Sequence, residues 1–203
     1  MIFKCSFSYG KNKVIFENEE FDFLENKVNA ICGHNGAGKT TLLKCAGGIF
    51  NQKESLLSSW YVAAGGALIQ HFSLLEHLRL LGKEEEGQPY ISLFEIEDVK
   101  NKSISRLSTG QKMICSVITA LCSDADILLL DEPFGPLDPV NAEKLSSVLK
   151  ECRKTVIITS HDLYLTSQVA DKIFFIKNGR VTFNRLNTKI DSKELKNKYR
   201  ELA

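Results

Sequence analysis

Three mostly apolar runs along the chain each lead into polar residues. They span residues 28–32, 127–130 and 155–160, and β-branched residues dominate the last. Continuous hydrophobicity, without alternation, is typical of strands that are covered on both faces, as in a parallel sheet. Ligand-binding groups lie at the carboxyl ends of such strands. The pattern therefore predicts an α/β core whose chemistry is carried by the residues that follow these runs.

Alternating and helical patterns surround this core. A period-two pattern predicts an amino-terminal antiparallel sheet from residues 3–9, 14–16 and 21–24. Near the carboxyl end, Asn178 and Gly179 stand between two apolar segments and predict a hairpin. Helices are expected at 113–121 and 141–150.

The stretch from residue 71 to residue 106 predicts a reduced helical part. It contains a charged segment at 83–87, which we interpret as a solvated break. A small apolar patch follows it, made of Ile91, Leu93, Phe94 and Ile96. Beyond residue 184 we expect only a short helical tail, capped by Asp191 and Ser192.

A complete G-x-x-x-x-G-K-T sequence follows the first run directly. Its glycines allow backbone N–H groups to point inward at phosphate oxygens, and the helix that opens there directs its positive end to the same place. Lys39 adds a full charge at the β- and γ-phosphates, and Thr40 offers a hydroxyl to Mg²⁺. The expected nucleotide-binding residues are Gly33, His34, Asn35, Gly36, Ala37, Gly38, Lys39, Thr40 and Thr41.

Acidic residues and a histidine follow the other two runs. Asp131 is expected to hold the Mg²⁺ site, and Glu132 to polarise an attacking water. His161 falls at the next strand end, where it is expected to contact the γ-phosphate and orient the water. The alternatives are a surface turn before Pro133 and a solvated loop histidine.

The pentapeptide Leu-Ser-Thr-Gly-Gln at 107–111 precedes an apolar helix. Ser108 offers a hydroxyl and Gly110 an unobstructed backbone N–H, so the start of this helix suits a phosphate. An ordinary serine-capped helix start explains the same residues, and the two interpretations are compatible.

In this order, the motifs resemble those of an ABC-type ATP-binding cassette, the nucleotide-binding subunit of an ABC transporter. The resemblance rests on a Walker A loop at 33–40, a signature at 107–111, a Walker B strand at 127–132, a D-loop-like segment at 135–138 and the H-loop His161. It covers the chain to about residue 181. Tyr9 matches the aromatic residue that stacks on adenine in this family. A rim tyrosine of an early strand is the alternative.

The resemblance implies a head-to-tail dimer with a second nucleotide-binding subunit, identical or different. ATP on the Walker A loop of one subunit is then closed by Ser108, Thr109, Gly110 and Gln111 of the other. Asp138 is expected to act across the interface, although Gly135 and Pro136 depart from the usual D-loop.

Gln70 is the candidate for the Q-loop glutamine that reaches Mg²⁺ and senses a transmembrane partner. The helical part begins almost directly after it, so either this loop is shortened or the glutamine lies elsewhere. An amide in a polar turn is the alternative interpretation.

The length and composition of the chain limit its domain organisation and its partners. With 203 residues the chain is expected to form one domain: a core with its β subdomain at 1–70 and 107–184, a helical subdomain at 71–106 and a tail at 185–203. A net charge of +1 gives no case for binding nucleic acid. The six cysteines have no metal-ligand spacing, and we expect them to be reduced and buried. We also expect no leader or membrane span, since no apolar run approaches the roughly 18 to 20 residues that spanning requires.

Two function classes remain. The first is an ATP-hydrolysing subunit that drives translocation, with export favoured by the compact chain. It would lie on the cytoplasmic face of a membrane and bind a separately encoded transmembrane permease. The second is a soluble ABC ATPase that acts in cofactor or complex assembly without a membrane partner.

Overall fold

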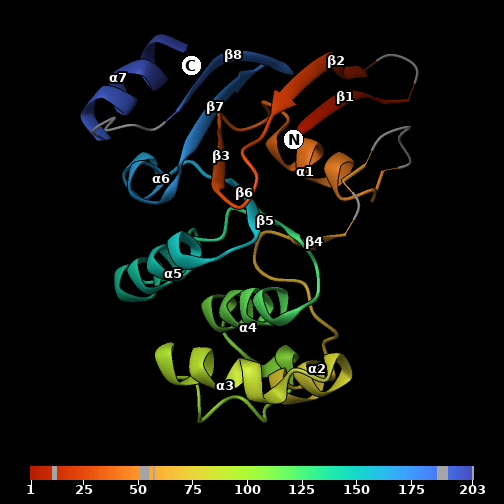
Figure 1. The fold of residues 1–203 in the computed structure, drawn as a ribbon, viewed down its shortest axis with the longest axis vertical. Helices are drawn as coiled ribbons and strands as arrows, with labels where there is room; N and C mark the ends of the chain where they lie inside the picture. Colours follow the sequence, from red (N-terminus) through yellow and green to blue (C-terminus); the bar gives the residue numbers. More distant parts are fainter. Residues whose placement is uncertain (11–12, 51–54, 57, 187–191, 203) are drawn as a thin grey trace.

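The computed structural model describes residues 1–10, 13–50, 55–56, 58–186 and 192–202. It contains a six-stranded sheet with strand order β4-β5-β6-β3-β7-β8 and a separate two-stranded sheet, β1-β2 (Figure 1). The strands of the large sheet are β3 (Val28–Cys32), β4 (Ser59–Val62), β5 (Ile127–Asp131), β6 (Thr155–Thr159), β7 (Lys172–Lys177) and β8 (Arg180–Leu186). All three apolar runs form buried strands, so the α/β fold is confirmed.

The large sheet is parallel except at one edge. Strands β4, β5, β6, β3 and β7 run in the same direction, and β8 returns antiparallel to β7 through the hairpin at Asn178 and Gly179. In the register of β5 and β6, Asp131 is paired with Thr159. The carboxyl ends of the central strands therefore form one edge, and the residues after them lie together.

Each face of the sheet has its own apolar core. One core packs around helix α1 (Lys39–Ala46) and the two-stranded sheet, and the other around α4 (Thr109–Cys122), α5 (Pro139–Glu151) and α6 (Leu163–Val169). Side chains alternate between these faces along a strand. Because Leu129 and Ile157 belong to the core on the α1 side, Asp131 and Thr159, two positions further along, face α1 as well.

The amino-terminal antiparallel sheet consists of β1 (Ile2–Tyr9) and β2 (Lys13–Asp22). The two alternating segments expected at 14–16 and 21–24 belong largely to one strand, and an irregular register near Phe7 in β1 explains why their patterns seemed separate. The Lys172 ammonium, which is buried, lies 2.6 Å from a carboxylate oxygen of Asp22 and ties this sheet to β7.

The helical part lies at the opposite end of the molecule from β1 and β2 (Figure 1). It contains α2 (Leu74–Leu81) and α3 (Glu84–Leu93), which pack against α4. The break expected at 83–87 is limited to Gly82 and Lys83, because residues 84–87 begin α3. Three acidic residues in its first turn stabilise the helix, because they lie at its positive end. Gly87 allows the Leu78 side chain to pack closely against α3. Leu93, expected in the apolar patch, is 42% exposed.

The carboxyl-terminal residues form β8 and then helix α7 (Ser192–Leu202). The strand thus extends into the segment expected to be a helical tail, and Asp191, expected to cap the helix, lies outside the described residues. Five of the cysteines are buried and Cys152 is partly exposed. Over the described ranges, the structure contains no helix with the length and apolar character needed to cross a membrane.

Gly179 offers a test of the contact between the hairpin and β2. Its φ is +73°, and an added Cβ would overlap the backbone carbonyl oxygen of Ile15. Gly82 has a similar φ of +67° but open space around it. Both Gly→Ala variants are disfavoured by roughly 1–2 kcal/mol in the left-handed conformation. Because of the overlap, we expect Gly179→Ala to lower the free energy of unfolding by about 1–3 kcal/mol more than Gly82→Ala does. Urea denaturation measures both variants, and equal losses would contradict the close contact.

Candidate active site

The loop at 33–40 connects β3 to α1 and exposes the start of that helix. Gly36 and Gly38 have φ values of +83° and +107°, which favour glycine. Gly38 is also the N-cap of α1, and no side chain caps this helix end. The first N–H groups of an α-helix have no partner within the helix. In this loop they are available to an anion, as the glycine-rich sequence predicts.

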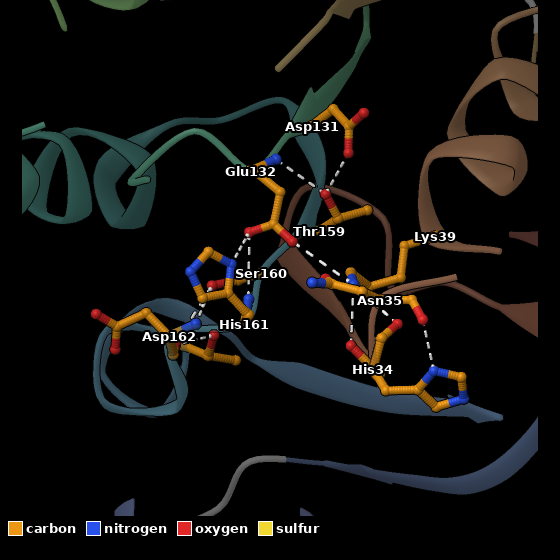
Figure 2. Close-up of polar contacts among 11 residues, drawn as sticks. His34, Asn35, Lys39, Asp131, Glu132, Thr159, Ser160, His161 and Asp162 are labelled. Carbon is orange, nitrogen blue, oxygen red and sulfur yellow. Dashed lines mark hydrogen bonds and ion pairs between the residues drawn. The ribbon is translucent and has the colours of Figure 1, made fainter. Parts of the chain in front are cut away.

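The Lys39 side chain turns back across the loop. Its ammonium donates to the carbonyl oxygen of Gly33 at 2.9 Å and lies 3.6 Å from Oε1 of Glu132. The His34 ring is held against the loop by a 2.7 Å contact between Nδ1 and the Asn35 carbonyl oxygen. The charge of Lys39 is thus placed between the phosphate loop and the acidic strand end (Figure 2).

Glu132 and His161 are hydrogen-bonded to each other. The Glu132 Oε2 atom lies 2.7 Å from His161 Nδ1 and accepts from the His161 backbone N–H at 3.2 Å. Because a carboxylate only accepts, Nδ1 carries the proton of this bond. Figure 2 shows Glu132 between His161 on one side and Lys39 on the other. The second carboxylate oxygen, Oε1, faces the phosphate loop.

Asp131 is held at both carboxylate oxygens. The Thr159 hydroxyl donates to Oδ1 at 2.6 Å, and the Tyr61 phenol donates to Oδ2 at 3.3 Å. Burial and the neighbouring Asp131 carboxylate raise the pKa of Tyr61, so the phenol stays a donor. We predicted neither Thr159 nor Tyr61 from the sequence, since only the strand register brings them to Asp131.

A cavity of about 350 Å³ opens over the phosphate loop. Tyr9 lies at its rim, and the Tyr9 hydroxyl is 3.3 Å from the hydroxyl of Thr41. The Tyr9 ring makes edge contacts with Phe7 and Phe50. An aromatic ring beside the phosphate loop suits a nucleobase, and the stacking of Tyr9 on adenine stays a prediction. The cavity is lined by Tyr9, Lys13, Ile15, Asn35, Gly36, Gly38, Lys39, Thr40, Thr41 and Glu132.

The signature residues line a different cavity, of about 550 Å³. Ser108 caps α4: its hydroxyl accepts from the Gln111 N–H, and the Ser108 N–H donates to Oε1 of Gln111, which forms a capping box. Asp138 caps α5, and hydrogen bonds from the Asn141 backbone and side chain lower the Asp138 pKa. Thr109, Gly110 and Asp138 line the same cavity. The signature cavity and the phosphate-loop cavity share no lining residue.

Gln70 is not brought to the carboxylates in this structure. It lies eight residues beyond the end of β4 at Val62, and its side-chain amide donates to the Leu68 carbonyl in its own loop. Its backbone carbonyl accepts from the N–H of Ser105, just before the signature. The alternative interpretation, an amide in a polar turn, describes the observed contacts.

A glycine-rich loop that opens a helix after β3, and two carboxylates at the end of β5, a parallel strand of the same sheet, define a P-loop nucleotide-binding protein. The sequence model of the family described as "ABC transporter" matches residues 16–135. The chain therefore belongs to the ABC transporter family and is an ATP-binding cassette of it, a class of ATPases.

Two curated relatives illustrate the similarity. An uncharacterized ABC transporter ATP-binding protein of Methanocaldococcus jannaschii is 28% identical over 85% of this chain and 72% of its own length. The methionine import ATP-binding protein of Clostridioides difficile is 30% identical over 85% of this chain, which spans 64% of that protein.

Solved structures support the fold. The ATP-binding subunit of an ABC transporter aligns with a TM-score of 0.84 at 21% identity, over 98% of each chain. A dimeric ATP-binding cassette, in a post-hydrolysis state with ADP and Pi, aligns with a TM-score of 0.80 at 22% identity. That alignment covers 94% of this chain and all of the other.

Lys39→Ala tests the phosphate cradle. A hydrogen bond to a charged group contributes about 1.5–3 kcal/mol, so we expect the Kd for ATP to rise roughly 10- to 100-fold. Lys27→Ala is the matched control, because Lys27 precedes the other end of β3, where it is 58% exposed and pairs with Asp171. A fluorescent ATP analogue measures both affinities. An unchanged Kd in Lys39→Ala would count against the cradle.

Proposed function

We propose that this chain hydrolyses ATP at composite sites and drives transport through a separately encoded transmembrane permease. One observation carries the proposal: the signature and the phosphate loop line separate cavities of the same chain. The signature has the chemistry to bind a phosphate, with a capped helix start and a glycine in the first turn. A second subunit, facing head to tail, supplies a phosphate for it to hold.

The chemistry of hydrolysis follows from the geometry of Glu132. A water attacks the γ-phosphorus, a new P–O bond forms, and the bond to the β-phosphate oxygen breaks to give ADP and inorganic phosphate. Oε1 of Glu132 accepts the proton of the water, because Oε2 is occupied by His161. Lys39 and the phosphate loop stabilise the charge that develops on the γ-phosphate.

The donor set beside the phosphate loop fits Mg²⁺. This ion prefers oxygen ligands and commonly uses one or two protein groups while keeping several waters. Thr40 offers an exposed hydroxyl, and each oxygen of Asp131 keeps a free lone pair beyond the one that accepts from Thr159 or Tyr61. We therefore propose that Thr40 and Asp131 would hold the ion, which would supply positive charge to offset the charge of the phosphates. Gln70 has no place in this assignment.

ATP acts in this scheme as the link between two subunits. Binding favours the closed dimer because the nucleotide contacts the cradle of one subunit and Ser108, Thr109, Gly110 and Gln111 of the other, and hydrolysis removes that preference. Identical subunits supply two competent sites, since the cradle, carboxylates and signature are all present in this chain. The single-domain organisation proposed above, with subdomain boundaries near residues 70, 106 and 184, is part of this proposal.

The cassette does not fix the direction of transport. The compact chain favours export, whereas relatives are named for methionine import and arginine transport. We propose a position on the cytoplasmic face of a membrane, where the permease supplies both the substrate pathway and the direction. A soluble assembly ATPase is the competing function.

Glu132→Gln tests the general base. The amide keeps the size of the side chain but cannot take a proton, so we expect loss of steady-state ATP hydrolysis with ATP-dependent dimerisation retained. Phosphate release measures the first property and analytical ultracentrifugation with ATP the second. Glu151→Gln is the control, since Glu151 is the exposed last residue of α5 and lies outside the cavities that Glu132 lines. Turnover by Glu132→Gln at the wild-type rate would reject the assignment.

Affinity purification separates the transporter from the soluble alternative. We expect the tagged chain, expressed in its native host, to be recovered from detergent-solubilised membranes together with a polytopic protein. A high-salt wash controls for weak adsorption to the membrane surface, because exposed charge pairs are screened by salt. Complete recovery in the soluble fraction, without such a protein, would favour the assembly ATPase.

A further inference from the structure

One buried hydroxyl contacts both carboxylates of the active site. Thr159 donates to Oδ1 of Asp131 at 2.6 Å and accepts from the backbone N–H of Glu132 at 2.9 Å (Figure 2). We propose that Thr159 is a positioning residue that sets Asp131 and Glu132 in one arrangement, and that Tyr61 supports it from the other oxygen of Asp131. The inference rests on the proposed function, because it assigns the two carboxylates to Mg²⁺ and to the attacking water.

The chemistry of a hydroxyl suits this double role. A hydroxyl has one proton to donate and two lone pairs to accept with, so it serves an acceptor and a donor together. The side chain of Thr159 is fully buried. Water therefore has no access to replace either bond, and a side chain without the hydroxyl leaves the Glu132 N–H and one Asp131 oxygen unpaired.

The backbone of Glu132 shows why its N–H needs a fixed partner. Glu132 has a φ of +49°, in the left-handed region that non-glycine residues rarely adopt. Such a conformation persists only where the surroundings over-determine it. The Thr159 hydroxyl holds the backbone of Glu132, and His161 holds its side chain. Loss of the hydroxyl releases the restraint on the Glu132 N–H, and Oε1 is then held less firmly toward the phosphate loop.

Tyr61 provides the second support. Tyr61, Asp131 and Thr159 come from the adjacent strands β4, β5 and β6 and lie on the face of the sheet that packs against α1. The phenol reaches Oδ2 of Asp131 at 3.3 Å, which is longer than the 2.6 Å contact from Thr159. We therefore expect Tyr61 to matter less than Thr159. With both oxygens held, rotation of the Asp131 carboxylate is restricted.

Thr159→Val and Thr159→Ser separate the hydroxyl from the shape of the side chain. Loss of a residue that orients a metal ligand typically costs 10- to 100-fold in metal affinity or activity. We expect Thr159→Val to lower kcat about 10- to 100-fold and to raise the Mg²⁺ concentration for half-maximal rate, with the Kd for ATP measured without Mg²⁺ unchanged. We expect Thr159→Ser to retain most of both properties. Tyr61→Phe should show the same pattern to a smaller extent.

Mn²⁺ binding provides a readout without turnover. The full chain is titrated with Mn²⁺ in the presence of a non-hydrolysable ATP analogue, and free Mn²⁺ is followed by electron paramagnetic resonance. We expect weaker Mn²⁺ binding in Thr159→Val and near wild-type binding in Thr159→Ser. Thr155→Val is the matched control: this buried threonine of β6 accepts from the Asn26 backbone N–H at 2.9 Å, at the far end of the strand. It should lose stability without losing Mn²⁺ affinity.

The outcomes distinguish the inference from the proposed function. Wild-type protein that neither binds nor hydrolyses ATP rejects the proposed function. Wild-type protein that turns over, with Thr159→Val equal to it in kcat and Mn²⁺ affinity, overturns only the role of Thr159. Equal losses of kcat and Mn²⁺ affinity in Thr159→Ser and Thr159→Val overturn this role too, because the hydroxyl, which serine keeps, would then not explain the effect. If Thr159→Val does not fold, Thr159→Ser and Tyr61→Phe decide: wild-type Mn²⁺ affinity in Tyr61→Phe, or loss of it in Thr159→Ser, contradicts the proposal.

Discussion

The parallel pairing of β5 with β6 is the constraint on which the active site depends. It places Asp131 beside Thr159 and brings the residues after both strands to one edge of the sheet. A shift of one residue would turn the Asp131 side chain to the opposite face, away from α1 and the phosphate loop. The register is specified by the two apolar cores, since Leu129 and Ile157 face α1 while Leu128 and Ile158 face the other helices. The chemistry thus depends on hydrophobic packing that contains no reactive group.

The same sheet explains how a charged site persists in a largely buried place. The Lys39 ammonium lies among loop carbonyls and near Glu132, Glu132 is bonded to His161, and Asp131 is bonded to Thr159 and Tyr61. A buried charge without partners is costly, so each of these contacts offsets part of the cost of desolvation. The partners also restrict rotation, and preorganised groups need little rearrangement when charge develops on a phosphate.

The parts that the sequence predicted are those whose chemistry is local. The phosphate loop and the strand before it need only neighbouring residues, and the capping box of Ser108 and Gln111 spans a single turn. The missed parts depend on contacts between distant segments. Strand β4 is short and reads Ser-Trp-Tyr-Val, without a long apolar run, and only its pairing with β5 identifies it. Thr159 and Tyr61 acquire their roles through the same register.

The helical part shows the other limit of local reasoning. The acidic segment at 83–87 was interpreted as a break because charge alone does not distinguish a loop from an exposed first turn of a helix. Two contacts favour the helix here: Gly87 packs against Leu78, and the acidic residues lie at the positive end of α3. Gln70 is a related case, because proximity in sequence to the helical part does not show which group its side chain contacts; here the amide donates to the Leu68 carbonyl.

The contacts of the loop around Gln70 give it a different place in the molecule. Gly66 packs so closely on α4 that an added Cβ would lie 2.7 Å from the Lys112 carbonyl oxygen. Further along, the carbonyls of Gln70 and Phe72 accept from the N–H groups of Ser105 and Ile104. These bonds fasten the loop to the backbone on both sides of the signature, because Ile104 and Ser105 precede it and Lys112 follows it. The loop around Gln70 is therefore attached to the backbone that carries Ser108 and Gly110.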